Sequence, residues 1–374
     1  MSNIRETTLH LLQEGTGKTL DLRLEQNLTP PTVIELKPET TNTYLCDLTE
    51  GTVVDWGDGT KSVVTANEAA ERAYHTYAAT ATAPRVVTID GVIDRGERPI
   101  GSAFDKNALI AVRSLGELTG EVGCLFSNCS SLTEIPEGLF DRCKEVTDFS
   151  ICFSYCSSLT AIPAGLFDHC KEVTSFDSCF SNCSSLTEIP EGLFDRCKEV
   201  TDFSVCFSYC SSLTAIPAGL FDNCTAVTTF SQCFSNCRSL TEIPEGLFDH
   251  CTAVTDFSVC FSNCSSLTEI PEALFDHCKE VTDFGSCFSY CSSLTSTPAG
   301  LFDHCKEVTS FNSCFSNCSS LTRESPSTLV DGKKIRLWER SPENGFAKPI
   351  YASSCFKNCK GLSDYAEIPN YWRF

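Results

Sequence analysis

Residues 210–236 read C-S-S-L-T-A-I-P-A-G-L-F-D-N-C-T-A-V-T-T-F-S-Q-C-F-S-N, and variants of this string recur seven times across residues 129–317 at a strict 27-residue period. A period of 20–50 residues is typical of a solenoid, in which each unit buries its apolar face only by stacking on copies of itself. The period therefore predicts a stack of coils. Surfaces of this kind usually bind a partner and seldom catalyse a reaction.

The apolar positions within one unit predict how each coil is built. The V-T-x-F-S-x segment carries β-branched and aromatic residues, which favours a short strand that stacks into a parallel sheet. The L-F-D-x-C-K-E segment is expected to form a helical or 3-10 turn with its apolar side chains facing inward. The I-P-x-G segment breaks the chain, and its proline belongs in a corner because it has no amide donor for a ladder.

The chain before the repeats has a different pattern. From Thr32 to Gly91, short β-rich runs alternate with turn residues, which predicts a small antiparallel sandwich. The run Val53–Thr60 reads V-V-D-W-G-D-G-T and predicts a strand that enters a D-G hairpin turn. Asp55 and Asp58 could be a calcium site, but the turn explains them more simply.

Two resemblances to known families follow from these motifs. W-G-D-G-T at residues 56–60 with H-T-Y at 75–77 resembles the PKD domain, an immunoglobulin-like β-sandwich that acts as a spacer or binding module. The repeat L-T-x-I-P-x-G-L-F-D-x-C-x-x-V-T-x-F resembles the leucine-rich repeat. Its C-F-x-x-C-x-S-L-T-x-I-P part resembles BspA-like bacterial repeats, although the consensus Asn is absent and the period is longer. The resemblance implies a surface or adhesive protein of bacteria or their phages.

The expected fold is thus a leucine-rich-repeat α/β solenoid preceded by a small immunoglobulin-like β-sandwich. Residues 103–112 are interpreted as a degenerate copy of L-F-D-x-C-x-x-V, with Asn107 in place of Cys, and Cys124 stands one position out of register. The predicted organisation is an extension (1–31), a PKD-like sandwich (32–98), an N-terminal capping coil (99–128), the 27-residue repeats (129–322), and an insertion with a C-terminal cap (323–374). An aromatic tail that docks a partner is the alternative for the last segment.

The chain has 26 cysteines, most of them in columns with a 27-residue spacing. Buried, reduced thiols are favoured because free cysteine packs as a small apolar residue. Disulfide bonds between coils remain an alternative, since stacked coils bring equivalent cysteines within bonding range. Zinc is disfavoured because there is no paired C-x2-C knuckle. The columns are Cys156, Cys183, Cys210, Cys237, Cys264 and Cys291; Cys170, Cys197, Cys224, Cys251, Cys278 and Cys305; and Cys152, Cys179, Cys206, Cys233, Cys260, Cys287 and Cys314.

Composition excludes several classes of function. A formal net charge of -21 would repel a phosphate backbone, so nucleic-acid binding is not expected. No run approaches the roughly 18–20 apolar residues of a membrane span, and the first residues lack the apolar core of a signal peptide. The chain contains no Gly-rich phosphate loop, H-E-x-x-H or G-x-S-x-G, so we expect no enzyme activity and no cofactor or metal. The resemblance alone favours a cell-surface, extracellular or virion-associated location.

One column of small polar residues is the candidate binding surface. Each member follows a Thr on the predicted strand, where the concave sheet of a solenoid usually meets its ligand. We expect contact with a protein or glycan; simple solvation of the sheet is an equal alternative. Two further hypotheses are a structural spacer or phage-particle component without a ligand, and a redox or metal-storing thiol protein. The oligomeric state is left open. The column is Asp148, Ser175, Asp202, Thr229, Asp256, Asp283 and Ser310.

Overall fold

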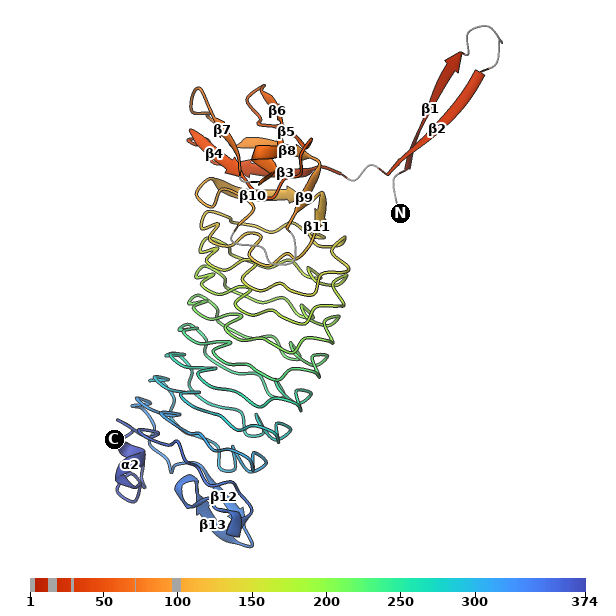
Figure 1. The fold of residues 1–374 in the computed structure, drawn as a ribbon. Coiled ribbons are helices and arrows are strands. Elements are labelled where there is room, and N and C mark those ends of the chain that lie inside the picture. The colour runs from red at the N-terminus through yellow and green to blue at the C-terminus, as the bar shows by residue number, and fades with distance from the viewer. Residues whose placement is uncertain (1–3, 13–18, 28–29, 71, 96–101) are drawn as a thin grey trace.

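A computed structural model describes residues 4–12, 19–27, 30–70, 72–95 and 102–374 of the 374-residue chain. Figure 1 shows a long stack of coils with a group of β-strands at its N-terminal end and a short group of elements at its C-terminal end. An antiparallel hairpin of β1 (Ile4–Leu12) and β2 (Thr19–Asn27) projects from the strand group. Of the predicted extension 1–31, residues 1–3, 13–18 and 28–29 lie outside the described residues.

The N-terminal strands form the antiparallel sheets that the sequence predicts. A five-stranded sheet has the order β10-β3-β8-β5-β6, and a two-stranded sheet pairs β4 with β7. Buried side chains of both sheets belong to one hydrophobic core. The bounds are β3 Thr32–Leu36, β4 Asn42–Leu45, β5 Val53–Asp55, β6 Lys61–Val63, α1 Ala66–Ala70, β7 Ala73–Thr76, β8 Arg85–Asp90, β9 Val92–Asp94, β10 Leu109–Ser114 and β11 Glu117–Thr119, with β9 and β11 parallel.

The W-G-D-G-T and H-T-Y motifs meet in space. The His75 ring stacks on Trp56 at 4.7 Å between ring centres, and its Nε2 lies 2.9 Å from Asp58 Oδ2. The Tyr77 hydroxyl donates to the Trp56 carbonyl at 3.1 Å. Asp58 Oδ1 also accepts from the Thr60 hydroxyl at 2.6 Å and from the Thr60 amide at 3.0 Å. The hydrogen bond from the Thr60 hydroxyl is the largest cause that lowers the pKa of Asp58 to about 2. The Asp58 carboxylate is therefore engaged by the turn and by His75.

The transition to the stack departs from the sequence interpretation. Strand β10 lies within the predicted capping coil, yet it pairs with β3 and completes the five-stranded sheet. The Phe104 ring stacks on Phe126 at 5.3 Å, so residue 104 matches the C-F-S segment of the repeat rather than L-F-D. The boundary predicted between residues 98 and 99 lies outside the described residues.

Cys124 lies one position before the repeated cysteine, as the sequence indicates, but the backbone around it is in register with the later coils. Its amide donates to the Ser150 carbonyl, as the Ile151 amide donates to Asp177 one coil later. Cys124 therefore takes the position of Ile151, and fully buried Leu125 takes the position of the repeated cysteine. The backbone needs no local adjustment where the array begins.

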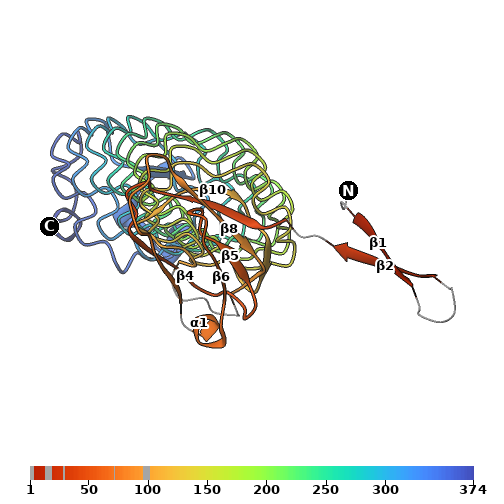
Figure 2. The same cartoon turned by 90° about the horizontal axis from the view of Figure 1, so that it is seen from above.

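The repeats form the predicted stack, with one coil per 27 residues. Single parallel bridges join residues exactly one period apart, as between Asp202 and Thr229, and Figure 2 shows successive coils lying over one another with a steady sideways shift. The predicted short strands are reduced to these single bridges. The predicted helical turns are wrong: the coils of residues 129–317, all of them described, contain turns and no helix. The I-P-x-G corner is confirmed, and Gly219 within it has φ +73°.

Three columns of phenylalanine fill the inside of the stack. Neighbouring rings in a column lie 5.2–6.2 Å apart and nearly parallel, and rings of different columns meet at steep angles. Such offset and tilted contacts are the favourable geometries for aromatic pairs. The columns pass through Phe126, Phe153, Phe180, Phe207, Phe234, Phe261, Phe288, Phe315 and Phe356; Phe140, Phe167, Phe194, Phe221, Phe248, Phe275 and Phe302; and Phe149, Phe176, Phe203, Phe230, Phe257, Phe284 and Phe311.

The C-terminal segment packs on the last coil. Phe356 stacks on Phe315 at 5.7 Å and continues the first column, and buried Trp372 packs against Phe356 and Phe311. The buried Arg340 guanidinium donates to two carbonyls of the last coil. These contacts cover the end of the phenylalanine columns, while Tyr371 and Phe374 at the end of the chain are 54% and 71% exposed. The elements are β12 Ser327–Val330, β13 Lys333–Arg336, the 3-10 turns Leu337–Glu339 and Pro342–Asn344, and α2 Asn370–Arg373.

Candidate functional site

The predicted binding column is brought together along one edge of the stack. Consecutive members from Asp148 to Ser310 are joined by parallel bridges, one per coil. The members are partly buried, except for Ser310, which is buried. The arrangement is a ladder of single residues rather than a sheet, so the concave sheet expected from the sequence is not formed by this column.

The side chains of this ladder also have a structural role. Each Asp accepts a hydrogen bond from the amide two residues later, as Asp202 Oδ1 does from Ser204 at 2.7 Å. Ser175 and Thr229 do the same with their hydroxyl oxygens at 3.1 Å. This local bond is a known property of Asp, Ser and Thr at turns. The polarity of the column is thus explained in part by turn formation.

Two further columns lie just beyond the ladder, and sequence reasoning did not select them. Both have left-handed backbone conformations, with φ between 55° and 64°. We call them the first and second left-handed columns. The first holds Cys124, Ile151, Ser178, Val205, Gln232, Val259, Ser286, Ser313 and Ser354. The second holds Asn128, Tyr155, Asn182, Tyr209, Asn236, Asn263, Tyr290, Asn317 and Asn358.

Several occupants of these columns are poorly suited to their backbone. Asn tolerates the left-handed region, whereas a β-branched or bulky residue there is an outlier. Ile151, Val205 and Val259 are β-branched, and the three tyrosines are bulky and half-exposed, with Tyr155 at 53% and Tyr209 at 50%. Neighbouring coils carry Asn at the tyrosine position and Ser, Gln or Cys at the position of the β-branched residues. The apolar side chains are therefore displayed at positions where the fold favours small polar ones.

The left-handed columns line an open groove of about 370 Å³ that crosses four coils. Two tyrosines, two β-branched side chains and two amides contribute to it. The remaining lining is serine, and none of these residues carries a formal charge. The Asn182 side-chain amide donates to Ser181 at 2.9 Å, which fixes its orientation. The groove is lined by Ile151, Ser154, Tyr155, Ser178, Ser181, Asn182, Val205, Ser208, Tyr209 and Gln232.

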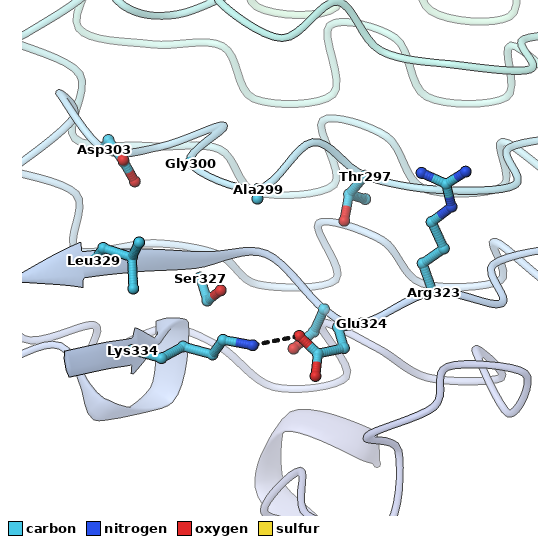
Figure 3. Close-up of a pocket in the computed structure, with 10 residues that line it drawn as sticks. Thr297, Ala299, Gly300, Asp303, Arg323, Glu324, Ser327, Leu329 and Lys334 are labelled. Carbon is cyan, nitrogen blue, oxygen red and sulfur yellow. Dashed lines mark hydrogen bonds and ion pairs between the residues drawn. The ribbon is translucent and has the colours of Figure 1, made fainter. Parts of the chain in front are cut away.

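A second cavity of about 530 Å³ lies between the last coil and the β12–β13 hairpin. Figure 3 shows Lys334 reaching toward Glu324, whose carboxylate lies 2.5 Å from the Lys334 ammonium. Buried Thr297 Oγ1 and Asp303 Oδ1, also at this cavity, have no hydrogen-bond partner. The charges that line the cavity are mixed, so the lining does not indicate one class of ligand.

The cysteines are free thiols in the structure, and all except Cys46 and Cys124 are buried. Cysteines of the first column donate their thiol hydrogen to a phenylalanine carbonyl of the preceding coil, as Cys210 does to Phe180 at 3.2 Å. Burial raises the pKa of the Cys210 thiol to about 12. Because the thiolate is the reactive form, this environment favours inert packing over redox chemistry.

The described residues contain neither a cluster of metal ligands nor a helix that could span a membrane. Within those residues, no three or more His, Cys, Asp or Glu side chains are grouped so that they could hold a metal ion. Nor does any helix described by the structure have the length and apolar character needed to cross a membrane.

Comparison with known proteins identifies the family of the repeats. A model described as "Mycoplasma protein of unknown function, DUF285" matches residues 124–245 and 201–328, which together make more than half of the chain. The chain belongs to the DUF285 family. The matched region of this DUF285 protein contains the regular coils, the ladder and the groove. No curated protein matches the chain.

Two solved structures share weak similarity with this DUF285 protein. One is the Toll–Spatzle complex of Drosophila development and innate immunity, with 17% identity over 66% of this chain and 38% of that chain, at a TM-score of 0.24. The other is the TLR13–ssRNA13 complex, with 13% identity over 67% and 45%, at a TM-score of 0.14. The DUF285 chain thus spans less than half of either neighbour. TM-scores this low do not relate the folds.

Replacing Val259 with Asn is expected to stabilise the protein by about 1 kcal/mol, because a left-handed conformation costs a residue with a Cβ roughly 1–2 kcal/mol and Asn tolerates it better. Val259 has φ 61° and lies outside the groove lining. Urea denaturation followed by circular dichroism measures the change. Ser286→Asn is the matched control at the same repeat position and should stabilise less. An unchanged or lowered midpoint for Val259→Asn would show that the backbone there is not strained.

Proposed function

We propose that this protein is a non-enzymatic binding or adhesion protein that contacts a protein or glycan along the edge of its coil stack. In this proposal the stack is a BspA-like leucine-rich-repeat solenoid (129–322) with a C-terminal cap (323–374). A PKD-like domain that begins at residue 32 and includes β10 in its sheet carries the stack at a cell or virion surface. The binding surface combines the ladder of Asp148, Ser175, Asp202, Thr229, Asp256, Asp283 and Ser310 with the adjoining groove.

The observation that carries the proposal is the display of half-exposed tyrosines and β-branched residues on left-handed backbone. Residues in such conformations cost free energy and tend to cluster at ligand sites, where surrounding structure enforces them. Here the stack enforces the backbone in every coil, but only some coils place an apolar side chain on it.

The contribution of the ladder to binding can be tested with substitutions that keep the hydrogen bonds of its turns. Ser occupies the ladder at Ser175 and keeps the acceptor oxygen, so Asp202→Ser with Asp256→Ser removes two charges and retains the local hydrogen bonds. The full chain and the double variant would be compared on arrays of printed glycans and purified extracellular proteins. If the ladder contacts the ligand, the double variant should bind about tenfold or more weakly, as for charged groups at a binding surface.

A matched control lies on the I-P corner of the coils, where Glu188 and Glu242 are exposed. Glu188→Ser with Glu242→Ser makes the same charge change away from the ladder and should leave binding unaltered. If the unmodified chain binds nothing on either array, the stack is better explained as a spacer that sets length within a surface or phage particle. The regular, charge-mixed outer face of the coils suits that alternative.

A further inference from the structure

We propose that the groove between Ile151 and Gln232 binds a neutral, extended β-linked glycan, with Tyr155 and Tyr209 as stacking platforms. The inference rests on the proposed binding function and names the ligand of the groove. Three observations support this inference together: the groove, its two exposed tyrosines and its two amide side chains. A protein partner is the competing occupant and is an outcome of the test below.

The tyrosine rings have the exposure that stacking on a sugar requires. Tyr155 is 53% exposed and Tyr209 is 50% exposed. About half of each tyrosine is thus accessible to a ligand, while its backbone is held by the neighbouring coils. The apolar C–H face of a pyranose packs on an aromatic ring, and a hydroxyl at the ring edge can hydrogen-bond to the sugar. Ile151 and Val205 widen the apolar surface beside each ring.

The spacing of the rings suits a polymer with a two-residue repeat. Tyr155 and Tyr209 stand two coils apart, and adjacent coils are separated by about 5 Å, so the platforms lie about 10 Å apart. The buried phenylalanine column beside them steps by 5.4 Å and 5.6 Å over the same coils. An extended β-1,4-linked glycan turns alternate rings by half a turn and so presents the same face once per disaccharide. Its disaccharide length is comparable to two coils.

One amide side chain lies between the two tyrosines, and a second lies one coil beyond Tyr209. Asn182 stands at the tyrosine position of the intervening coil, and its side chain is oriented by the bond to Ser181. Gln232 lies one coil beyond Val205 in the first left-handed column. Amide side chains both donate and accept hydrogen bonds, which suits the hydroxyls of a sugar. Alternating aromatic and amide residues therefore match alternating faces of the glycan.

The electrostatics favour an uncharged ligand. None of the residues that line the groove carries a formal charge, while the whole chain has a net charge of -21. Asp177 precedes Ser178 at the groove, and burial raises the pKa of this carboxyl. A polyanionic glycan would meet long-range repulsion with no cation in the groove to offset it. The favoured class is thus a neutral polysaccharide built from hexoses or N-acetylhexosamines.

The full chain should be titrated with β-1,4-linked hexasaccharides of glucose and of N-acetylglucosamine, with binding measured by calorimetry. The double variant Tyr155→Asn/Tyr209→Asn removes both platforms but installs the residue that neighbouring coils carry at this position. It should fold normally and weaken binding of the better hexasaccharide about tenfold or more, since each aromatic contact contributes a several-fold effect. Tyr290→Asn is the matched control because Tyr290 has the same backbone and 53% exposure but lies outside the groove lining.

Each outcome decides the proposal. Loss of hexasaccharide binding in the double variant with binding retained in Tyr290→Asn supports it. Equal loss in both variants overturns the assignment to this groove. If neither hexasaccharide binds while a protein on the array does, the proposed binding function stands but the glycan inference fails. If the unmodified chain binds neither glycan nor protein, both fail together.

Discussion

Raising the pH from 8 to 10 is expected to unfold the coil stack. Of the 26 cysteines, 24 are buried, and burial raises the pKa of thiols such as Cys210 and Cys251 to about 12 from an ordinary value of 9.0. Between these values the unfolded chain loses thiol protons that the folded chain keeps. Each such thiol lowers the free energy of unfolding by about 1.4 kcal/mol per pH unit. Below pH 8 both states hold the protons and the effect vanishes.

The expected loss is large because many thiols act together. A few fully buried thiols would outweigh the 5–15 kcal/mol by which folded proteins are usually stable within one or two pH units above 9. Urea midpoints measured by circular dichroism at pH 7.5, 8.5, 9.5 and 10, with reductant present, give the slope. A Cys206→Ala/Cys210→Ala variant should show a shallower slope above pH 9. Equal midpoints at pH 7.5 and 10 would contradict buried, protonated thiols in the folded state.

The stack could be predicted from the sequence because its period reflects core packing. Val227, Phe230 and Cys233 recur at fixed offsets in each unit, and all three are buried. A strict repeat of buried positions leaves few alternatives to stacked coils. The same argument predicted the antiparallel strands near the N-terminus, where alternation over β3 matches its burial pattern.

The length of the strands could not be predicted, because two local features end each extended segment. Asp202 accepts from the amide of Ser204, and Val205 then adopts φ 59°. A turn bond followed by a left-handed residue leaves room for only one bridging residue per coil. The β-branched residues near this segment favoured a strand on propensity, and tertiary stacking overrode that preference.

The sequence predicted the ladder residues of the candidate site but not the adjoining left-handed columns, for a related reason. The sequence shows that Asn182 and Tyr209 occupy equivalent positions in alternating S-N-C and S-Y-C units. The frequency of Asn there is a signal of left-handed backbone that could have been used. The role of Asp202 in its turn and the exposure of Ile151 depend on the direction in which each side chain points. That direction is set by corners of the coil whose dihedral angles the sequence does not specify.

Different residue columns form the core of the stack and its variable surface. The phenylalanine and cysteine columns face inward, while most residues of the left-handed columns are at least partly exposed. These columns vary between Asn, Ser, Tyr, Ile, Val, Gln and Cys. Changes in the outer columns therefore alter the surface at a local cost of about 1–2 kcal/mol without altering the core. A repeated array of this kind can change its exposed surface one coil at a time.

Replacing Phe221 with Ala in the middle of the stack is expected to destabilise the protein by about 3–5 kcal/mol. The Phe221 side chain is fully buried and contacts Phe203 and Phe230 at 4.9 Å and 4.7 Å between ring centres. Its removal leaves a cavity that rings fixed in three columns cannot collapse to fill. Phe221→Leu keeps most of the volume and should cost about 1–1.5 kcal/mol. Phe374→Ala, at a 71% exposed side chain, should cost almost nothing.

The loss should be confined to the neighbourhood of Phe221, because each coil contacts only the coils next to it and stability is a sum of nearest-neighbour terms. Hydrogen exchange followed by mass spectrometry should show faster exchange in the coils around residues 194–248 and unchanged exchange near β3 and β8. The mutation then acts as a break in the stack, and the two flanking arrays remain folded on their own caps. Uniformly faster exchange across the chain would instead mean that the coils and the N-terminal sheet unfold as one cooperative unit.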